Sequence, residues 1–365
     1  MLATTAFSGF GAVEARRVLI KRAGAEGVIP SRPRRQRRAT TRPSKIPFPR
    51  REAIIFRMSA ARKVDLIEAP NNLGLRPPKP GIEPGAWRGP AALDHAGLAL
   101  RLRPDQHKRL ARPRYATDAQ PGTRIRNGVA LRTFSLELAA EVARSLERGA
   151  LPIVIGGDCS NLLGCVLALR RGGGRGLVHV DGHSDFFHPG NYDAASRLGS
   201  AAGMDLALAT GRGEDLLTKW PEVDGPLVAD ADAAQIGERE ASDPDYAYRD
   251  IETTSIDRTT VQKLKTEGVG ATIERALRRL EQRKIAQAWL HVDFDVLDQA
   301  VMPAVDSPGS PGLSYAELAA LIAGLIRSGR IAGVDFAIYD PDLDPGGRYA
   351  RELVGCIGDS LGIAA

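Results

Sequence analysis

The sequence predicts a three-layer α/β/α sandwich around a mostly parallel sheet. Two observations lead to this fold class. From residue 63 onward, short apolar runs alternate with segments of helical spacing, and that alternation is typical of βαβ units. Acidic clusters follow three of the apolar runs, at the strand ends where open α/β folds bind ligands. We see no internal repeat and no second domain, and therefore expect one domain over residues 58–365.

The individual elements follow from their residue patterns. We expect strands at the short apolar runs 64–69, 152–156, 176–180, 286–292 and 331–339. Helical spacing predicts helices over residues 136–146, 271–280, 315–326 and 348–361. Ser314 stands at the N-cap of the third helix, with Glu317 at the capping-box position. Residues 185–202 lack periodicity, so we expect a long substrate-facing loop there.

Composition indicates a cytoplasmic protein. Hydrophobic residues make up 43% of the chain, enough for a sizeable core. Three cysteines without paired spacing argue against a disulfide framework. A membrane span needs about 20 mostly apolar residues, and the most apolar window, residues 150–169, is interrupted by Asp158. Glu14 comes too early for a signal peptide.

The basic charge belongs to the first 57 residues. They hold 14 Lys/Arg and 3 Asp/Glu, a net charge of +11, whereas the rest of the chain carries −5. This leader is rich in Arg and Pro, and we expect it to be disordered. It could be a nucleic-acid-binding arm or a transit peptide. We favour an upstream extension, with the working start at Met58, and expect no nucleic-acid partner.

Three acidic clusters follow predicted strands. They are GGDCS (156–160), DGHSD (181–185) and DFDVLD (293–298). The carboxyl ends of parallel strands gather along one edge, so these side chains should converge. Crowded carboxylates resist ionisation, and divalent cations would relieve the repulsion. Oxygen ligands with an imidazole suit manganese, and also nickel, iron or zinc. The alternative, in which each Asp only caps a helix or turn, explains one cluster better than three.

These motifs resemble the arginase (ureohydrolase) superfamily, which includes agmatinases and formimidoylglutamases. DGHSD is similar to the family's DAHxD motif, HVDFDVLD to its SxDxDxxD motif, and GGDCS stands where GGDHS is usual. Their order along the chain is the same. The opening VDLIEAPNNLGLRPPKPGIEPG and the late VDFAIYDPDLD add to a likeness that covers about residues 62–362. The resemblance implies a divergent member with an arginase-like fold.

The resemblance also implies a centre of two manganese ions. Asp181 and Asp293 would bridge the ions, His183 and Asp295 would complete one of them, and Asp185 would bind the other. A bridging hydroxide would attack a guanidinium or amidine carbon and release urea or ammonia. Family members form trimers and hexamers, so a homo-oligomer is expected.

Three departures argue against arginine as the substrate. Cys159 replaces a metal-ligand histidine, and a thiolate ligand favours softer metals such as zinc or iron. Ala202 stands where arginases carry a proton-shuttling histidine, and Ile338 where they carry the glutamate that pairs with the guanidinium.

Other side chains could take over these roles. We assign Asp185, His188 and Asp306 to catalysis, and Asp340 and Asp193 to binding of the small-molecule substrate. For His188 the alternative is a solvated loop histidine.

Cys159 admits two further interpretations. A helix N-terminus lowers a thiol's pKa, which would make it a nucleophile beside His183, or it could be an inert buried thiol. Cys165 fits the inert interpretation, as does Cys356. His179 and His291 lie within predicted strands and are expected in the core.

Two functions from different classes remain open. The leading hypothesis is a metal-dependent hydrolase of linear C–N bonds in guanidino, amidino or formimino compounds. The alternative is a family member that binds metal or ligand without turnover.

Overall fold

The computed structural model describes residues 63–240 and 249–362. They belong to one compact unit, Arg57–Ala365. The predicted disordered leader, residues 1–57, lies outside the described residues.

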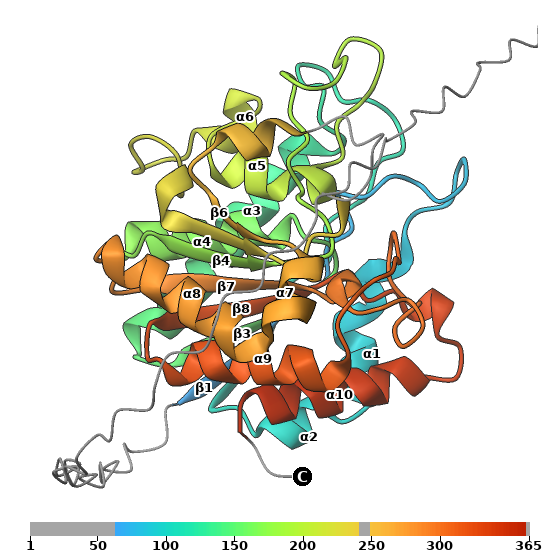
Figure 1. The fold of residues 1–365 in the computed structure, drawn as a ribbon. Helices are drawn as coiled ribbons and strands as arrows, with labels where there is room; N and C mark the ends of the chain where they lie inside the picture. Colours follow the sequence, from blue (N-terminus) through green and yellow to red (C-terminus); the bar gives the residue numbers. More distant parts are fainter. Residues whose placement is uncertain (1–62, 241–248, 363–365) are drawn as a thin grey trace, which may run out of the picture. The chain divides into compact units, whose positions relative to one another are not determined.

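A single parallel sheet of eight strands forms the centre of the fold (Figure 1). The strand order is β2-β1-β3-β8-β7-β4-β5-β6, and every pairing between neighbours is parallel. The strands are β1 (Val64–Ala69), β2 (Gln106–Arg109), β3 (Leu151–Gly156), β4 (Gly176–Val180), β5 (Ala233–Ile236), β6 (Asp257–Thr259), β7 (Ala288–Asp293) and β8 (Ile331–Ala337). The predicted fold class is confirmed.

Helices cover both faces of the sheet, and on each face a hydrophobic cluster lies between the helices and the strands (Figure 1). The first face carries α1 (Gly89–His95), α2 (Leu98–Leu102), α7 (Val261–Glu267), α8 (Val269–Gln282), α9 (Tyr315–Arg327) and α10 (Arg348–Ser360). The second carries α3 (Gly128–Glu147), α4 (Asn161–Arg171), α5 (Asp205–Ala209) and α6 (Asp215–Thr218). Along β3, Ile153 and Ile155 belong to the first cluster and Val154 to the second. Alternate side chains therefore serve both layers, which explains why the central strands read as continuous apolar runs.

The predicted elements are present, with shifts at their ends. The expected helix over 136–146 begins earlier, at Gly128, and the expected strand over 331–339 ends at Ala337. The capping box at Ser314 and Glu317 is confirmed by both of its hydrogen bonds. Strands β2, β5 and β6 were not predicted, because they contain three or four residues each, too few for a periodic signal.

The four central strands position the site. In the order β3, β8, β7, β4 they lie side by side. Each is followed by one of the motifs described above: GGDCS after β3, DGHSD after β4, DFDVLD after β7 and the end of VDFAIYDPDLD after β8. Over the two described ranges, no helix combines the length and hydrophobicity that crossing a bilayer requires.

Candidate metal centre

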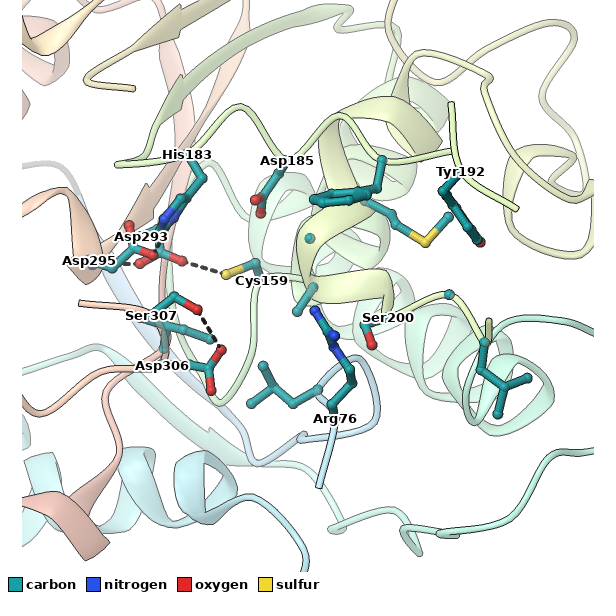
Figure 2. A pocket seen from close by; sticks show the side chains of 18 of the residues that line it. Arg76, Cys159, His183, Asp185, Tyr192, Ser200, Asp293, Asp295, Asp306 and Ser307 are labelled. Atoms are coloured by element: carbon teal, nitrogen blue, oxygen red, sulfur yellow. Dashed lines mark hydrogen bonds and ion pairs between the residues drawn. The ribbon is translucent and has the colours of Figure 1, made fainter. Parts of the chain in front are cut away.

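The acidic segments meet beyond the carboxyl ends of these strands. Cys159 lies in the turn between β3 and α4, and Asp181 directly follows β4. Asp293 is the last residue of β7, and Asp295 lies in the short 3-10 helix Phe294–Val296. Figure 2 shows His183, Asp293 and Asp295 together at one end of a cavity, with Cys159 and Asp185 beside them.

The cavity has a volume of about 280 Å³ and changes character along its length. Its acidic end is formed by Cys159, His183, Asp185, Glu240, Asp293, Asp295 and Asp306. The rest of the wall comes mainly from the loop after β4 and the loop after β1, and includes Leu75, Arg76, Phe187, Tyr192, Arg197, Ser200 and Ala202. A cavity of this size accommodates a small polar molecule.

Burial makes the carboxylates of the acidic end costly to ionise. It raises the pKa of Asp181 well above its ordinary value, and the charges of Asp295 and Asp293 raise it further. Burial is also the main reason for the raised pKa of Asp185 and Asp293, again with help from neighbouring carboxylates. Buried like charges in a low-dielectric environment resist ionisation together. A divalent cation among these oxygens would stabilise the charged carboxylates and so lower the pKa of each group.

His183 and Asp295 form an ion pair in which each side chain stabilises the charged form of the other. The Nδ1 atom of His183 lies 2.8 Å from Oδ2 of Asp295. Burial alone would lower the pKa of His183, but the charge and hydrogen bond of Asp295 raise it to about 10. Burial would raise the pKa of Asp295, yet His183 and then Arg239 hold it below its ordinary value. A metal ion would replace the proton that this pair shares.

Backbone hydrogen bonds hold the same carboxylates in place. The His183 N–H donates to Oδ1 of Asp181 over 2.6 Å, and the Gly182 N–H donates to Oδ1 of Asp295 over 3.0 Å. The Asp295 N–H donates to Oδ1 of Asp293 over 2.6 Å. Each carboxylate keeps a second oxygen for another partner. Among the described residues, Oδ2 of Asp181 is buried and has no hydrogen-bond partner.

The donor atoms fit a divalent metal. One ligand atom each of Asp181, His183 and Asp295 lies within 4.8 Å of the others, as close as shared coordination requires. Their carboxylate and imidazole groups are the ligands that manganese accepts. Asp185 and Asp293 extend the set towards Cys159.

Comparison with known proteins places this architecture in a family. The family model described as "Arginase family" matches residues 80–358. The chain belongs to the arginase family. It is 28% identical to Arginase-1 of Rattus norvegicus, over 84% of this chain and 92% of that protein. It is 26% identical to an arginase of Staphylococcus aureus, over 84% of this chain and 99% of that protein. The solved structure of the arginase from Bacillus caldovelox superposes with a TM-score of 0.71 and 25% identity, over 82% of this chain and 98% of the other.

Relative to the arginase-family pattern, two cavity positions are apolar in this chain. Ala202 and Ile338 both line the cavity, at the positions where the resemblance assigns a proton-shuttling histidine and a guanidinium-pairing glutamate. Ile338 follows β8 with a φ of 78°. A β-branched residue is strained in this left-handed region.

Cys159 is a buried neutral thiol rather than an activated one. Its Sγ donates to Oδ2 of Asp293 over 2.6 Å. Burial, then the charges of Asp293 and Asp185, raise its pKa well above the ordinary value. The expectation that the start of α4 lowers this pKa is wrong, because burial, and after it the charges of the surrounding carboxylates, raise the pKa instead. A cation in their midst would favour the thiolate.

Asp306, predicted as a catalytic residue, lines the cavity. Burial raises its pKa, and the Ser307 hydroxyl donates to its Oδ2 over 3.1 Å. Figure 2 places both residues below Asp295.

Four predicted residues lie outside the cavity lining, and one of them, Asp181, is buried and grouped with His183 and Asp295. The other three make contacts elsewhere. His188 directs its Nε2 to Oδ2 of Asp250, away from the acidic end. Asp340 accepts hydrogen bonds from the N–H groups of Gly85 and Asp342. Asp193 is exposed, and Ser196 and Ala195 hydrogen bonds lower its pKa. The carboxylates of Asp193 and Asp340 therefore accept hydrogen bonds from backbone N–H groups in turns, which is the ordinary role of Asp in loops.

The sequence analysis missed several cavity residues. Arg76 comes from the Pro-rich loop after β1, and Arg197 and Ser200 from the loop after β4. Glu240 closes the acidic end and accepts from the N–H and the hydroxyl of Ser184. Loop residues carry no periodic signal, so only the fold reveals them.

Proposed function

We propose that this protein is a metal-dependent hydrolase of a linear C–N bond in a guanidino, amidino or formimino compound. The observation that carries the proposal is the convergence of His183, Asp293 and Asp295 at one end of a cavity, with the buried Asp181 grouped with His183 and Asp295. Membership of a family of C–N hydrolases supports the reaction class. Divalent cations held there, most simply manganese, would lower the pKa of a water molecule and supply the nucleophile.

The chain's own residues divide the remaining tasks. Asp293 and Asp295 present oxygens to the reacting end, and the apolar side chains of Phe187 and Ile338 line the same cavity, where they exclude water. Formation of the C–O bond and cleavage of the C–N bond require a proton on the leaving nitrogen. Asp306 faces the cavity with a raised pKa, so its carboxyl group can hold that proton and deliver it.

Basic side chains favour a substrate that carries a carboxylate. Arg76 reaches into the cavity from the loop after β1, near enough to Asp306 to lower the pKa of that carboxyl group (Figure 2). Arg197 lines the same region, with its guanidinium 5.5 Å from the centre of the Phe187 ring. A guanidinium binds a carboxylate in a bidentate, charge-assisted way. The amidine of the substrate would then face Asp185 and Asp306, which replace the missing partner at Ile338.

The alternative is a ligand-binding family member without turnover, and the apolar side chains of Ala202 and Ile338 favour it. A substrate panel distinguishes the two. Guanidino, amidino and formimino acids are incubated with protein loaded with manganese, nickel, iron or zinc, and urea and ammonia are measured. The hydrolase proposal expects release from at least one compound, and release abolished in Asp293→Asn. Binding of a panel compound without release under all four metals would support the alternative.

A further inference from the structure

A buried polar layer lies beneath the metal centre, between the sheet and α5. His179 of β4 and His291 of β7 are register partners on neighbouring strands. Their rings stack with centroids 4.8 Å apart, and both side chains are fully buried. The sequence analysis placed both histidines in the core, and their burial agrees. Two imidazoles in contact inside a sheet need polar partners, however, because an unsatisfied buried polar group costs free energy.

Acidic side chains face these rings from two directions. Asp205, the first residue of α5, has Oδ1 3.2 Å from Nε2 of His179 and Oδ2 3.5 Å from Nε2 of His291. Asp181 has Oδ2 3.7 Å from the same His179 nitrogen. All four side chains are fully buried. Two carboxylates and two imidazoles therefore point at one volume, on the side of Asp181 away from His183.

Several atoms that face this volume lack hydrogen-bond partners. In the described part of the chain, Nε2 of His291, Oδ2 of Asp205 and Oδ2 of Asp181 are buried and make no hydrogen bond. A buried donor or acceptor without a partner costs about 1–3 kcal/mol, so three on one volume imply a missing common partner. The ligand atoms of His179, Asp205 and His291 lie within 4.8 Å of one another.

The orientation of His291 matches that of a metal ligand. Its Nδ1 lies 2.7 Å from Oδ2 of Asp335, and the indole N–H of Trp289 donates to the other oxygen of that carboxylate over 2.6 Å. In the neutral tautomer that carries its proton on Nδ1, the carboxylate accepts from Nδ1 and Nε2 keeps a free lone pair, as in metal sites where a carboxylate orients a histidine ligand. The free Nε2 points at Asp205.

The spacings also fit coordination, and only the shortest of the three, between His179 and Asp205, is short enough for a hydrogen bond. Zinc binds imidazole nitrogen and carboxylate oxygen at about 2.0–2.2 Å in a tetrahedral arrangement, which separates neighbouring ligand atoms by about 3.4 Å. The three contacts are 3.2, 3.5 and 3.7 Å long. A charge-assisted hydrogen bond would instead be about 2.7–2.9 Å long.

We propose that His179, His291, Asp205 and Asp181 form an inner site for one divalent transition metal, zinc by its two-nitrogen, two-oxygen donor set. Asp181 then links two sites, with Oδ1 towards His183 and Oδ2 towards the inner ion. Cys159 lies near enough to Asp181 and His291 to serve as a further donor. The inner site shares Asp181 with the cavity centre, but His179, His291 and Asp205 lie outside the cavity lining. Its occupancy can therefore be measured independently of the proposed hydrolysis.

The number of imidazole ligands tests this site. Of the six histidines in the chain, His183 is the one that lines the cavity. In a His183→Gln variant, no ion in the cavity centre has an imidazole ligand. The metal-stripped variant is loaded with one equivalent of zinc, and its zinc-edge X-ray absorption is recorded. We expect one retained zinc per chain with two imidazole ligands. Zinc without imidazole ligands, or no retained zinc, would overturn the proposal.

Two further measurements separate the site from a folding effect. His183→Gln combined with His291→Gln should lose the imidazole signal, whereas its combination with His95→Gln, an exposed histidine, should keep it. If the first double variant fails to fold, anomalous diffraction from zinc-loaded His183→Gln decides. A peak about 2 Å from Nε2 of His291 supports the inner site, and its absence refutes it. An empty inner site would leave the hydrolase proposal intact, because the panel above measures that separately.

Discussion

Replacing Asp181 by Asn should uncouple the stability of the protein from divalent metal. Asp181 is fully buried, at the centre of the acidic cluster. The amide keeps an oxygen for the His183 N–H, which now donates to Oδ1 of Asp181, so the fold has little reason to change. The variant loses the negative charge that holds a cation. Asp193→Asn is the matched control, since Asp193 is an exposed loop residue whose side-chain acceptor role an amide also fills.

The size of the effect follows from linkage. A ligand present at about 1,000 times its Kd stabilises the folded state by about 4 kcal/mol. For a domain of this size, each kcal/mol raises Tm by about 2 °C. Saturating manganese should therefore raise the Tm of the wild type by about 8 °C, and the same should hold for Asp193→Asn. For Asp181→Asn the expected rise is below about 2 °C.

The way in which the manganese-induced rise in Tm changes with pH is a second, independent test of the same prediction. The pKa of Asp181 in the folded state is raised above its ordinary value near 3.8. The folded state thus binds more protons than the unfolded state, and this residue makes the metal-free protein less stable as pH rises above about 4. Metal needs the deprotonated carboxylate, so the manganese-induced rise in Tm should grow from pH 5 to pH 8.

Differential scanning calorimetry of metal-stripped and manganese-loaded protein measures both quantities. The reasoning is refuted if Asp181→Asn, correctly folded by circular dichroism, keeps the wild-type rise in Tm. It is equally refuted if that rise shrinks as pH increases.

Three further predictions concern the cavity and its frame. Arg76→Ala should raise KM for a carboxylate-bearing substrate about 10-fold or more with kcat little changed, and steady-state kinetics showing an unchanged KM would remove Arg76 from recognition. His188→Ala should leave kcat/KM within about twofold, because this ring contacts Asp250 rather than the cavity; a loss of 100-fold would restore its predicted catalytic role. Gly157→Ala should lower the free energy of unfolding by about 2 kcal/mol or more, because its Cβ would lie 1.7 Å from the Asn71 carbonyl oxygen, and denaturant titration with an unchanged midpoint would contradict that close packing.

The positions of the strand-end motifs were predictable, because a residue that directly follows a strand lies at the end of that strand whatever the rest of the fold. Apolar runs of five to seven residues identified β3, β4 and β7, and a parallel sheet brings the residues after such strands to one edge. Asp181, Asp293 and Cys159 could be placed this way without any knowledge of strand order.

Loop residues were not predictable, because their positions depend on tertiary contacts. Asp340 and Asp193 follow the same acidic pattern as the cluster, yet backbone N–H groups occupy their carboxylates. Arg76 enters the cavity from a Pro-rich loop that shows no periodicity. Asp205 resembles an ordinary helix-start residue, and its contact with His179 appears once α5 packs on the sheet.

The central claim is that a divalent cation neutralises the crowded carboxylates, and anomalous diffraction from crystals grown with manganese tests it most directly. The account predicts a manganese peak bounded by His183, Asp295, Asp181 and Asp293. It is contradicted if a crystal saturated with manganese has no peak among these four side chains.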